Sequence, residues 1–204
     1  KQNKYIQNYD LGKTAITNFV LKTDVKNKDS LNLIVSDIKG YFYIYNINKN
    51  SLINQFRIHD SAVVNFKISN NKQNLYGATK SNQKTLIYSV DITGTLKIFE
   101  LNSNSNSNSE YDTSEIKTAK ISKEGKGKIL FDIDEEEKFL VFSKNTKIKL
   151  LSLESLTKKN SQNSQNIKSL IINIGMHSQE ITNLKFSSDS RFILSSTKRD
   201  YIVS

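Results

Sequence analysis

The sequence predicts an all-β protein built from a repeated unit of four antiparallel strands. Short runs rich in Ile, Val, Phe, Tyr and Leu alternate with polar residues, and clusters of Asn, Ser, Asp, Gly and Lys interrupt them. No segment of ten or more residues carries the period of a helix. The length of 204 residues fits a single domain.

The strands follow one another in four units, each strand ending at a cluster of polar turn residues. The first unit, residues 11–58, is predicted to hold strands at 15–21, 32–37, 41–46 and 51–58. The second, residues 59–122, is predicted to hold strands at 62–68, 85–91, 95–101 and 115–121. The third, residues 123–176, is predicted to hold strands at 128–133, 138–143, 147–153 and 169–174. The last, residues 177–204, is incomplete, with strands at 180–186, 191–196 and 201–203.

Two tracts within these units are of low complexity. Residues 102–112 include NSNSNSNS, and residues 157–167 include KKNSQNSQN. The runs NSNSNSNS and KKNSQNSQN have no apolar residue to bury, so both tracts are predicted to be surface loops. The strand pattern continues on both sides, which favours insertions in one domain over linkers between domains.

The third strand of each unit recurs with a fixed spacing. The segments that begin at Tyr43, Lys97 and Lys149 lie 52–54 residues apart. A His also precedes the first strand in two units, as His59 and His177. Four-stranded propeller blades repeat every ~40–45 residues, and the inserted tracts account for the excess. We therefore expect a β-propeller of which about 3.75 blades are present, as part of a larger propeller, since closure takes roughly four to eight blades.

The repeat resembles the WD-repeat consensus, best in HSQEITNLKFSSDSRFILSSTKRDYIVS (177–204) and again in residues 59–101. The resemblance implies a rigid, non-catalytic platform for assembling other proteins. It also implies a hydrogen-bonded tetrad in each blade, to which His177, Ser195, Asp200, His59 and Ser89 would belong. The Trp of the consensus is replaced by Tyr45, Phe99 and Leu151, and its Asp position falls on Lys39 and Thr93.

No pattern of residues points to catalysis, a cofactor or a small-molecule substrate. The chain has no Cys, and two distant His are too few for a zinc site, so a structural role is expected for them. The acidic run 132–137 is expected to be a solvated turn, and the Lys- and Gly-rich segment 124–128 a turn that leads into a strand. No apolar run approaches the ~18 residues of a membrane span.

The net charge of +10 is the one feature that suggests a partner of a particular chemistry. Lysines that neutralise phosphates give RNA binding without sequence preference. The candidate contacts gather between the second and third units, at Lys117, Lys120, Lys123, Lys126 and Lys128. The alternative is an A/T-rich genome, which would enrich Lys and Asn and deplete Pro without selection on function.

The order of the units and the short turn at residues 143–146 are similar to the propeller of a UtpA-subcomplex subunit of the small-subunit processome. This resemblance implies a nucleolar scaffold in pre-ribosomal RNA processing. The alternatives are the non-catalytic propeller subunit of the tRNA guanine-N7 methyltransferase, which the segments 191–194 and 199–200 suggest, and a cytoplasmic adaptor in trafficking, cilia or ubiquitin ligation. No Asn-x-Ser/Thr sequon occurs, which favours a protein that is not secreted.

Overall fold

The chain forms a series of antiparallel sheets, described in a computed structural model for residues 14–23, 31–71, 84–103, 111–122, 129–158, 167, 169–199 and 201–203. The first two sheets are built from β1 (Ile16–Thr23), β2 (Leu31–Asp37), β3 (Tyr41–Asn46), β4 (Ser51–Arg57), β5 (Val63–Asn71), β6 (Lys84–Asp91), β7 (Thr95–Ser103) and β8 (Tyr111–Lys120). The others are built from β9 (Ile129–Ile133), β10 (Phe139–Lys144), β11 (Lys147–Ser152), β12 (Ile171–Met176), β13 (Asn183–Phe186), β14 (Ile193–Ser196) and β15 (Tyr201–Val203).

Within each sheet, every strand pairs with the next one in the sequence. The first three sheets have four strands each, β1–β4, β5–β8 and β9–β12, and the described part of the fourth has three, β13–β15. All pairings are antiparallel, as expected for strands joined by short hairpins. The prediction of an all-β chain made of four-stranded antiparallel units is confirmed.

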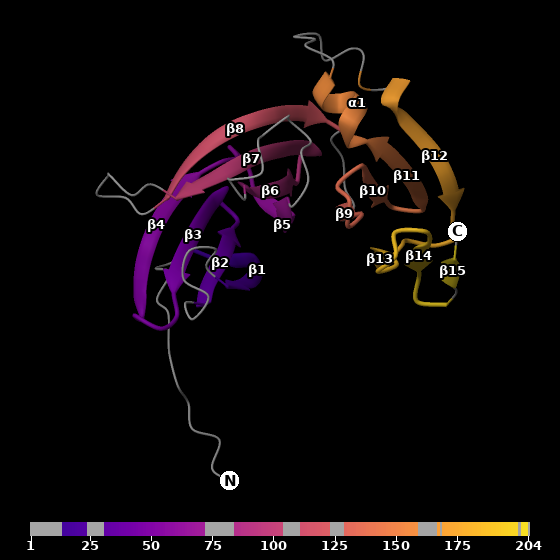
Figure 1. Ribbon diagram of the computed structural model, residues 1–204. Helices are drawn as coiled ribbons and strands as arrows, with labels where there is room; N and C mark the ends of the chain where they lie inside the picture. The colour runs from indigo at the N-terminus through magenta and orange to yellow at the C-terminus, as the bar shows by residue number, and fades with distance from the viewer. Residues whose placement is uncertain are drawn as a thin grey trace.

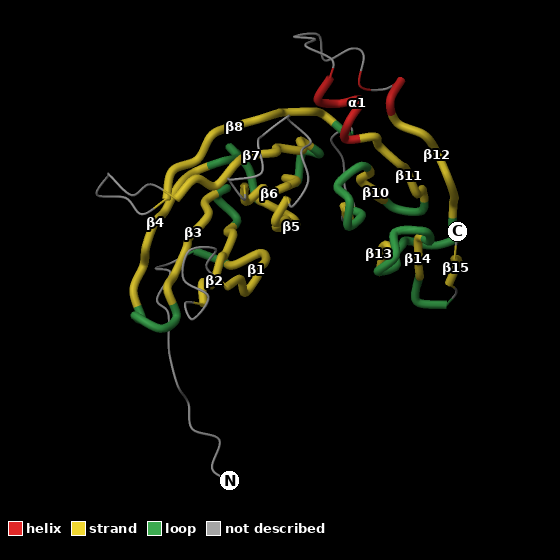
Figure 2. Tube along the Cα trace, in the orientation of Figure 1, coloured by secondary structure: helices red, strands yellow, loops and turns green. Residues whose placement is uncertain are grey.

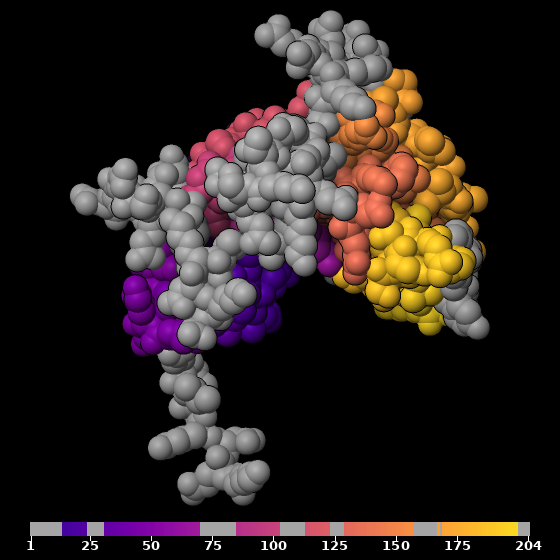
Figure 3. Space-filling model, viewed as in Figure 1, coloured from indigo at the N-terminus to yellow at the C-terminus, as the bar shows by residue number. Residues whose placement is uncertain are grey.

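The sheets are arranged along an arc in the order of the sequence (Figure 1). The first strands of the sheets, β1, β5, β9 and β13, lie on the inner side of the arc and contact one another in series. The fourth strands β4, β8 and β12 run along its outer side, and the short helix α1 (Leu153–Lys158) lies near β8 and β12 (Figure 2). In the space-filling view, the first sheet lies at one end of the arc and the last sheet at the other (Figure 3).

The core lies between neighbouring sheets. Phe42 of the first sheet packs edge-on against Phe66 and Phe99 of the second, with ring centroids 5.1 and 5.5 Å apart. All three side chains are fully buried. A second cluster joins the second and third sheets, and a third, around Val141 and Leu184, joins the third and fourth. The alternation of side chains along each strand supplies one apolar face to each neighbour.

Several strand boundaries differ from those predicted. Strands β7 and β8 continue into the first tract, with Asn102 opposite Asp112, because two extended segments joined by a hairpin can keep pairing whatever their side chains. Leu153, predicted to end a strand, instead begins the short helix α1 (Leu153–Lys158) and is buried there. Strand β12 begins two residues later than predicted. Most of both tracts, residues 104–110 and 159–166, lies outside the described residues.

The acidic run after β9 is not the solvated turn that the sequence predicted. Asp132, Asp134 and Glu137 are buried, and only Glu135 and Glu136 are exposed. The turn folds back toward the second sheet, where Glu137 finds its donors. The phenol of Tyr88 donates to Glu137 Oε2 over 3.0 Å, and the hydroxyl of Ser69 donates to Oε1.

Candidate functional site

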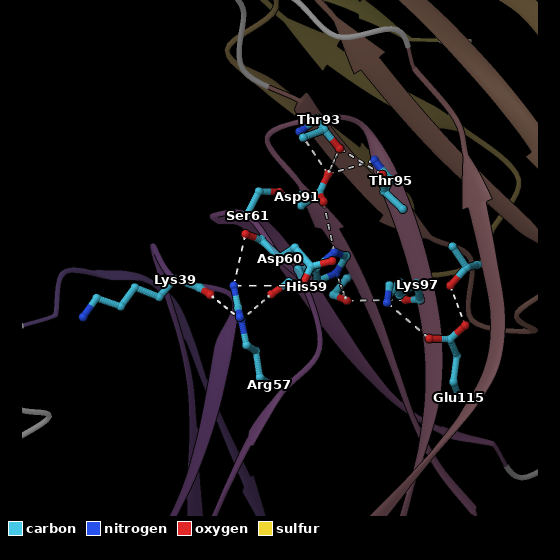
Figure 4. A network of polar contacts seen from close by, with 12 residues as sticks. Lys39, Arg57, His59, Asp60, Ser61, Asp91, Thr93, Thr95, Lys97 and Glu115 are labelled. Atoms are coloured by element: carbon cyan, nitrogen blue, oxygen red, sulfur yellow. Dashed lines mark hydrogen bonds and ion pairs between the residues drawn. The ribbon is translucent and has the colours of Figure 1, made fainter.

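A buried polar network joins the first sheet to the second, and we call it the His59 junction: His59, Ser61, Ser89 and Asp91 (Figure 4). His59 lies in the link between β4 and β5 and is fully buried. Its Nδ1 lies 3.2 Å from Asp91 Oδ2, and its Nε2 lies 2.8 Å from Ser89 Oγ. Because a carboxylate only accepts, Nδ1 carries the hydrogen in the bond to Asp91, and Nε2 forms the bond to Ser89.

Asp91 gathers more donors than any other carboxylate in Figure 4. Its Oδ1 accepts the backbone N–H groups of Thr93 and Thr95 at 3.0 and 2.9 Å, and its Oδ2 accepts the hydroxyl of Ser61 at 2.8 Å. Burial favours the neutral acid, but these hydrogen bonds and the one from His59 outweigh it. They hold the pKa of Asp91 well below its usual value, so Asp91 is ionised in the folded protein.

The first sheet contains the same turn. Asp37 Oδ1 accepts the backbone N–H groups of Lys39 and Tyr41, both at 2.8 Å, and Oδ2 accepts the hydroxyl of Thr14 at 2.8 Å. The phenol of Tyr43 also donates to Oδ2, over 3.1 Å. Burial and this bond to Asp37 raise the pKa of Tyr43 to about 12.

The prediction that the Asp position of the tetrad falls on Lys39 and Thr93 is wrong. These residues contribute backbone N–H groups, and the carboxylates come from Asp37 and Asp91, two residues earlier. An Asp at the end of the second strand accepts the amides of its own turn with one oxygen. Its other oxygen bonds the segment that precedes the first strand of the same sheet, at Thr14 for Asp37 and at Ser61 for Asp91. The segment Asp-Ile-x-Gly, repeated at 37–40 and 91–94, was the signal in the sequence.

Each of these turns ends in a glycine against which the following link packs. Gly40 has φ +85°, and a Cβ there would lie 2.0 Å from the carbonyl oxygen of His59. Gly94 has φ +83°, and a Cβ there would lie 2.7 Å from the carbonyl oxygen of Ser122. The glycine carbonyls accept from the links in turn, with Ile58 N and Ile121 N both 3.0 Å away. Only glycine combines this conformation with this approach.

Arg57, the last residue of β4, holds the same link from its other side. Its Nε donates to the carbonyl oxygens of His59 and Lys39 at 3.1 and 3.3 Å, and its Nη2 donates to that of Asp60 at 3.2 Å. The link is therefore bound to the first sheet through its backbone and to the second through the side chain of His59 (Figure 4).

A matching bond joins the third sheet to the fourth. Nε2 of buried His177 lies 2.8 Å from Ser195 Oγ on β14. Asp200, predicted to complete this tetrad, lies outside the described residues. The serine is the most regular member of the repeat. A serine that is at most 1% exposed occupies the second strand of every sheet, as Ser36, Ser89, Ser143 and Ser195. Sequence reasoning missed two of the four, although their spacing of 52–54 residues was visible.

The residues at the predicted Trp position occupy equivalent places. Tyr45, Phe99 and Leu151 are all buried on the third strands of their sheets. Phe99 packs in the cluster that joins its sheet to the preceding one, and Leu151 does the same one sheet later. Phe and Leu have no N–H to donate, so these two positions contribute packing alone.

The His59 junction has the connectivity of a catalytic Ser–His–Asp triad, but it is not arranged for nucleophilic attack. A catalytic serine must reach the substrate carbonyl. Ser89 is 0% exposed and His59 is 1% exposed, and the second strand surrounds the hydroxyl with protein. The geometry suits a cross-link between sheets.

Within the described ranges, no group of three or more His, Cys, Asp and Glu side chains is close enough to hold a metal ion. No helix in the same ranges is long and apolar enough to cross a membrane.

The structure does not bring the described members of the predicted lysine cluster together. Lys117 pairs with Ile98 and Lys120 with Thr95 across the sheet, so the two side chains point to opposite faces of β8. On the face of Lys120, Lys97 forms an ion pair with Glu115 at 3.3 Å, which lowers the local positive charge. Lys123, Lys126 and Lys128 lie outside the described residues.

Comparisons with known proteins bear on the fold. The sequence matches no known protein family and no curated protein. Among solved structures, the chain is similar to a computationally designed protein, Ika4, with a TM-score of 0.61 and 15% sequence identity. The likeness covers 100% of this chain and 98% of the designed one. At this identity it is a likeness of fold.

Proposed function

We propose that the chain is a WD-repeat β-propeller segment that acts as a non-catalytic platform for assembling other proteins. The observation that carries this proposal is the recurring junction, in which a link histidine bonds the buried serine of the next sheet at His59–Ser89 and at His177–Ser195. A buried cross-link of this kind stiffens the arrangement of sheets and leaves their rims and loops for partners.

The setting we propose is early pre-ribosomal RNA processing in the nucleolus, as part of the small-subunit processome. Its support is the resemblance in the order of the units and the net charge of +10, which attracts polyanions. RNA contact would then come from lysines on more than one surface, because Lys117 and Lys120 point to opposite faces of β8.

The test is purification of the tagged protein from its own cells, with and without ribonuclease, followed by identification of the bound proteins and RNA. Co-purification of pre-ribosomal RNA with other nucleolar proteins is the expected result. A set of cytoplasmic proteins that survives ribonuclease, without enriched RNA, would instead support the adaptor. Association with a tRNA methyltransferase would support the remaining alternative.

A matched pair of variants separates the contribution of the lysines from that of the platform. Replacing Lys117 and Lys120 together by Gln is expected to lower the recovered RNA and its salt dependence while the bound proteins stay the same. Replacing Lys144 and Lys147, at the β10–β11 turn, gives a control with the same change in charge. Equal losses in the two variants would mean that only total charge matters.

A further inference from the structure

A group of three charged side chains lies where the inner strands of the second, third and fourth sheets meet. Asp132 of β9 is between Lys67 of β5 and Lys185 of β13. Its Oδ1 lies 3.1 Å from Lys67 Nζ and 3.7 Å from Lys185 Nζ. Its Oδ2 accepts the backbone N–H of Phe186 at 3.0 Å. The cluster thus draws on three sheets that are consecutive along the arc (Figure 1).

The charges of this cluster do not balance. Two ammonium groups share one carboxylate, which leaves one positive charge. Within the described part of the chain, the ion pairs of Lys67 and Lys185 go to Asp132 alone. Glu137, also directed toward β5, already accepts the hydroxyls of Ser69 and Tyr88. A second anion is therefore what the cluster lacks.

The ammonium groups are also the accessible part of the cluster. The side chain of Lys185 is 48% exposed and that of Lys67 is 31% exposed, whereas that of Asp132 is only 11% exposed. The carboxylate is thus largely buried, and the two lysine side chains are partly exposed to solvent. Burial and the neighbouring Lys67 lower the pKa of Lys185, although Asp132 opposes this shift. The part of this shift that comes from Lys67 reflects repulsion between two cations, which an incoming anion would relieve.

We propose that the Lys67–Asp132–Lys185 cluster binds a single phosphoryl group, carried by a phosphorylated side chain or free as inorganic phosphate. Each ammonium group has three donors, and two of them around one point suit the tetrahedral oxygens of one phosphate. A nucleic-acid backbone would need cations repeated along a track, whereas these two lysines converge on a single oxygen atom. The site is independent of the lysines on β8 and of the proposed role in RNA processing.

The test is equilibrium dialysis of the full chain against radiolabelled inorganic phosphate in Tris buffer at low ionic strength. Saturable binding with a Kd on the order of 1 mM is expected for two solvent-facing lysines. Replacing Lys185 or Lys67 by Gln should each weaken binding by about tenfold or more. Lys147→Gln, which removes an exposed lysine of β11, should leave it unchanged. No saturable binding, or the same affinity in Lys185→Gln, would overturn the proposal.

The variant Asp132→Asn is expected to change the affinity for phosphate in the opposite direction. It removes the anion that competes for the two lysines, so the affinity for phosphate should rise by about tenfold. A drop in affinity, with circular dichroism unchanged, would overturn the proposal, because Asp132 would then be required for binding. Should the variant not fold, the two lysine variants still decide the question.

The source of the phosphoryl group is decided by competition. A phosphoserine peptide that displaces phosphate at lower concentration than phosphate itself would identify a phosphorylated protein as the ligand. A peptide no better than free phosphate would identify phosphate. A single-stranded RNA that displaces phosphate at lower concentration than either, and loses this ability in Lys185→Gln, would overturn the single-phosphoryl assignment in favour of a nucleic-acid backbone.

Discussion

Replacement of His59 by Ala tests whether the His59 junction stabilises the protein. The change removes two buried hydrogen bonds, one to the carboxylate of Asp91 and one to the hydroxyl of Ser89. A bond to a charged group contributes about 1.5–3 kcal/mol and a neutral one about 1 kcal/mol. The hydroxyl left behind and the space of the imidazole add to the cost. We expect the free energy of unfolding to fall by about 3–5 kcal/mol.

The assay is urea unfolding followed by far-ultraviolet circular dichroism and tyrosine fluorescence, since the chain has nine Tyr and no Trp. Ser61→Ala is the matched control, because it removes a single bond to the same carboxylate and should cost about 1–2 kcal/mol. In the double variant with Ser89→Ala, the two losses should overlap by about 1 kcal/mol. A cost for His59→Ala below about 1 kcal/mol, or strict additivity with Ser89→Ala, would refute the reasoning.

Three further changes follow from the same contacts. Gly40→Ala should destabilise by about 2–4 kcal/mol, since its Cβ would meet the backbone of His59 at positive φ, whereas Gly175→Ala, which meets only the side chain of Ile148, should cost about 1 kcal/mol or less by the same unfolding assay. Glu137 has a pKa raised chiefly by burial above the 4.5 of an unburied Glu, so its contribution to stability falls as pH rises through the folded-state pKa. Glu137→Gln should therefore gain stability over the wild type progressively from about pH 4.5 upward, and a constant difference across that pH range would contradict this. Leu151→Ala should cost about 2–5 kcal/mol, and a cost below about 1 kcal/mol would mean that the space it leaves can close.

The fold was predictable because it rests on a local pattern. Alternation between apolar and polar residues sets which side chains face the neighbouring sheet, and it is visible in a single strand such as β13, whose sequence is NLKF. The hydrogen bonds of the links between sheets are harder to predict from the sequence. That a carboxylate at Asp91 reaches a histidine 32 residues away depends on how two sheets meet.

The failures in the sequence analysis have the same physical origin. A consensus spacing assigned the acid of the tetrad to Thr93, whereas the turn geometry supplies it from Asp91. The acidic run at 132–137 looked solvated because like charges usually are, yet Glu137 is 3% exposed under two hydroxyls of the second sheet. The meeting of Lys67, Asp132 and Lys185 joins three units more than fifty residues apart, and no periodicity within one unit indicates it.

The segments that can vary in length are different from the links that set the curvature of the arc. The angle between the first two sheets is fixed by the short link between β4 and β5, which is fastened on both sides by Gly40, Arg57 and His59. The two low-complexity tracts instead connect β7 to β8 and α1 to β12, within single sheets. Repeats can expand or contract there without altering how one sheet is set against the next. Replication slippage that changes the length of these two tracts is thus tolerated by the fold, whereas a change in the length of the links is not.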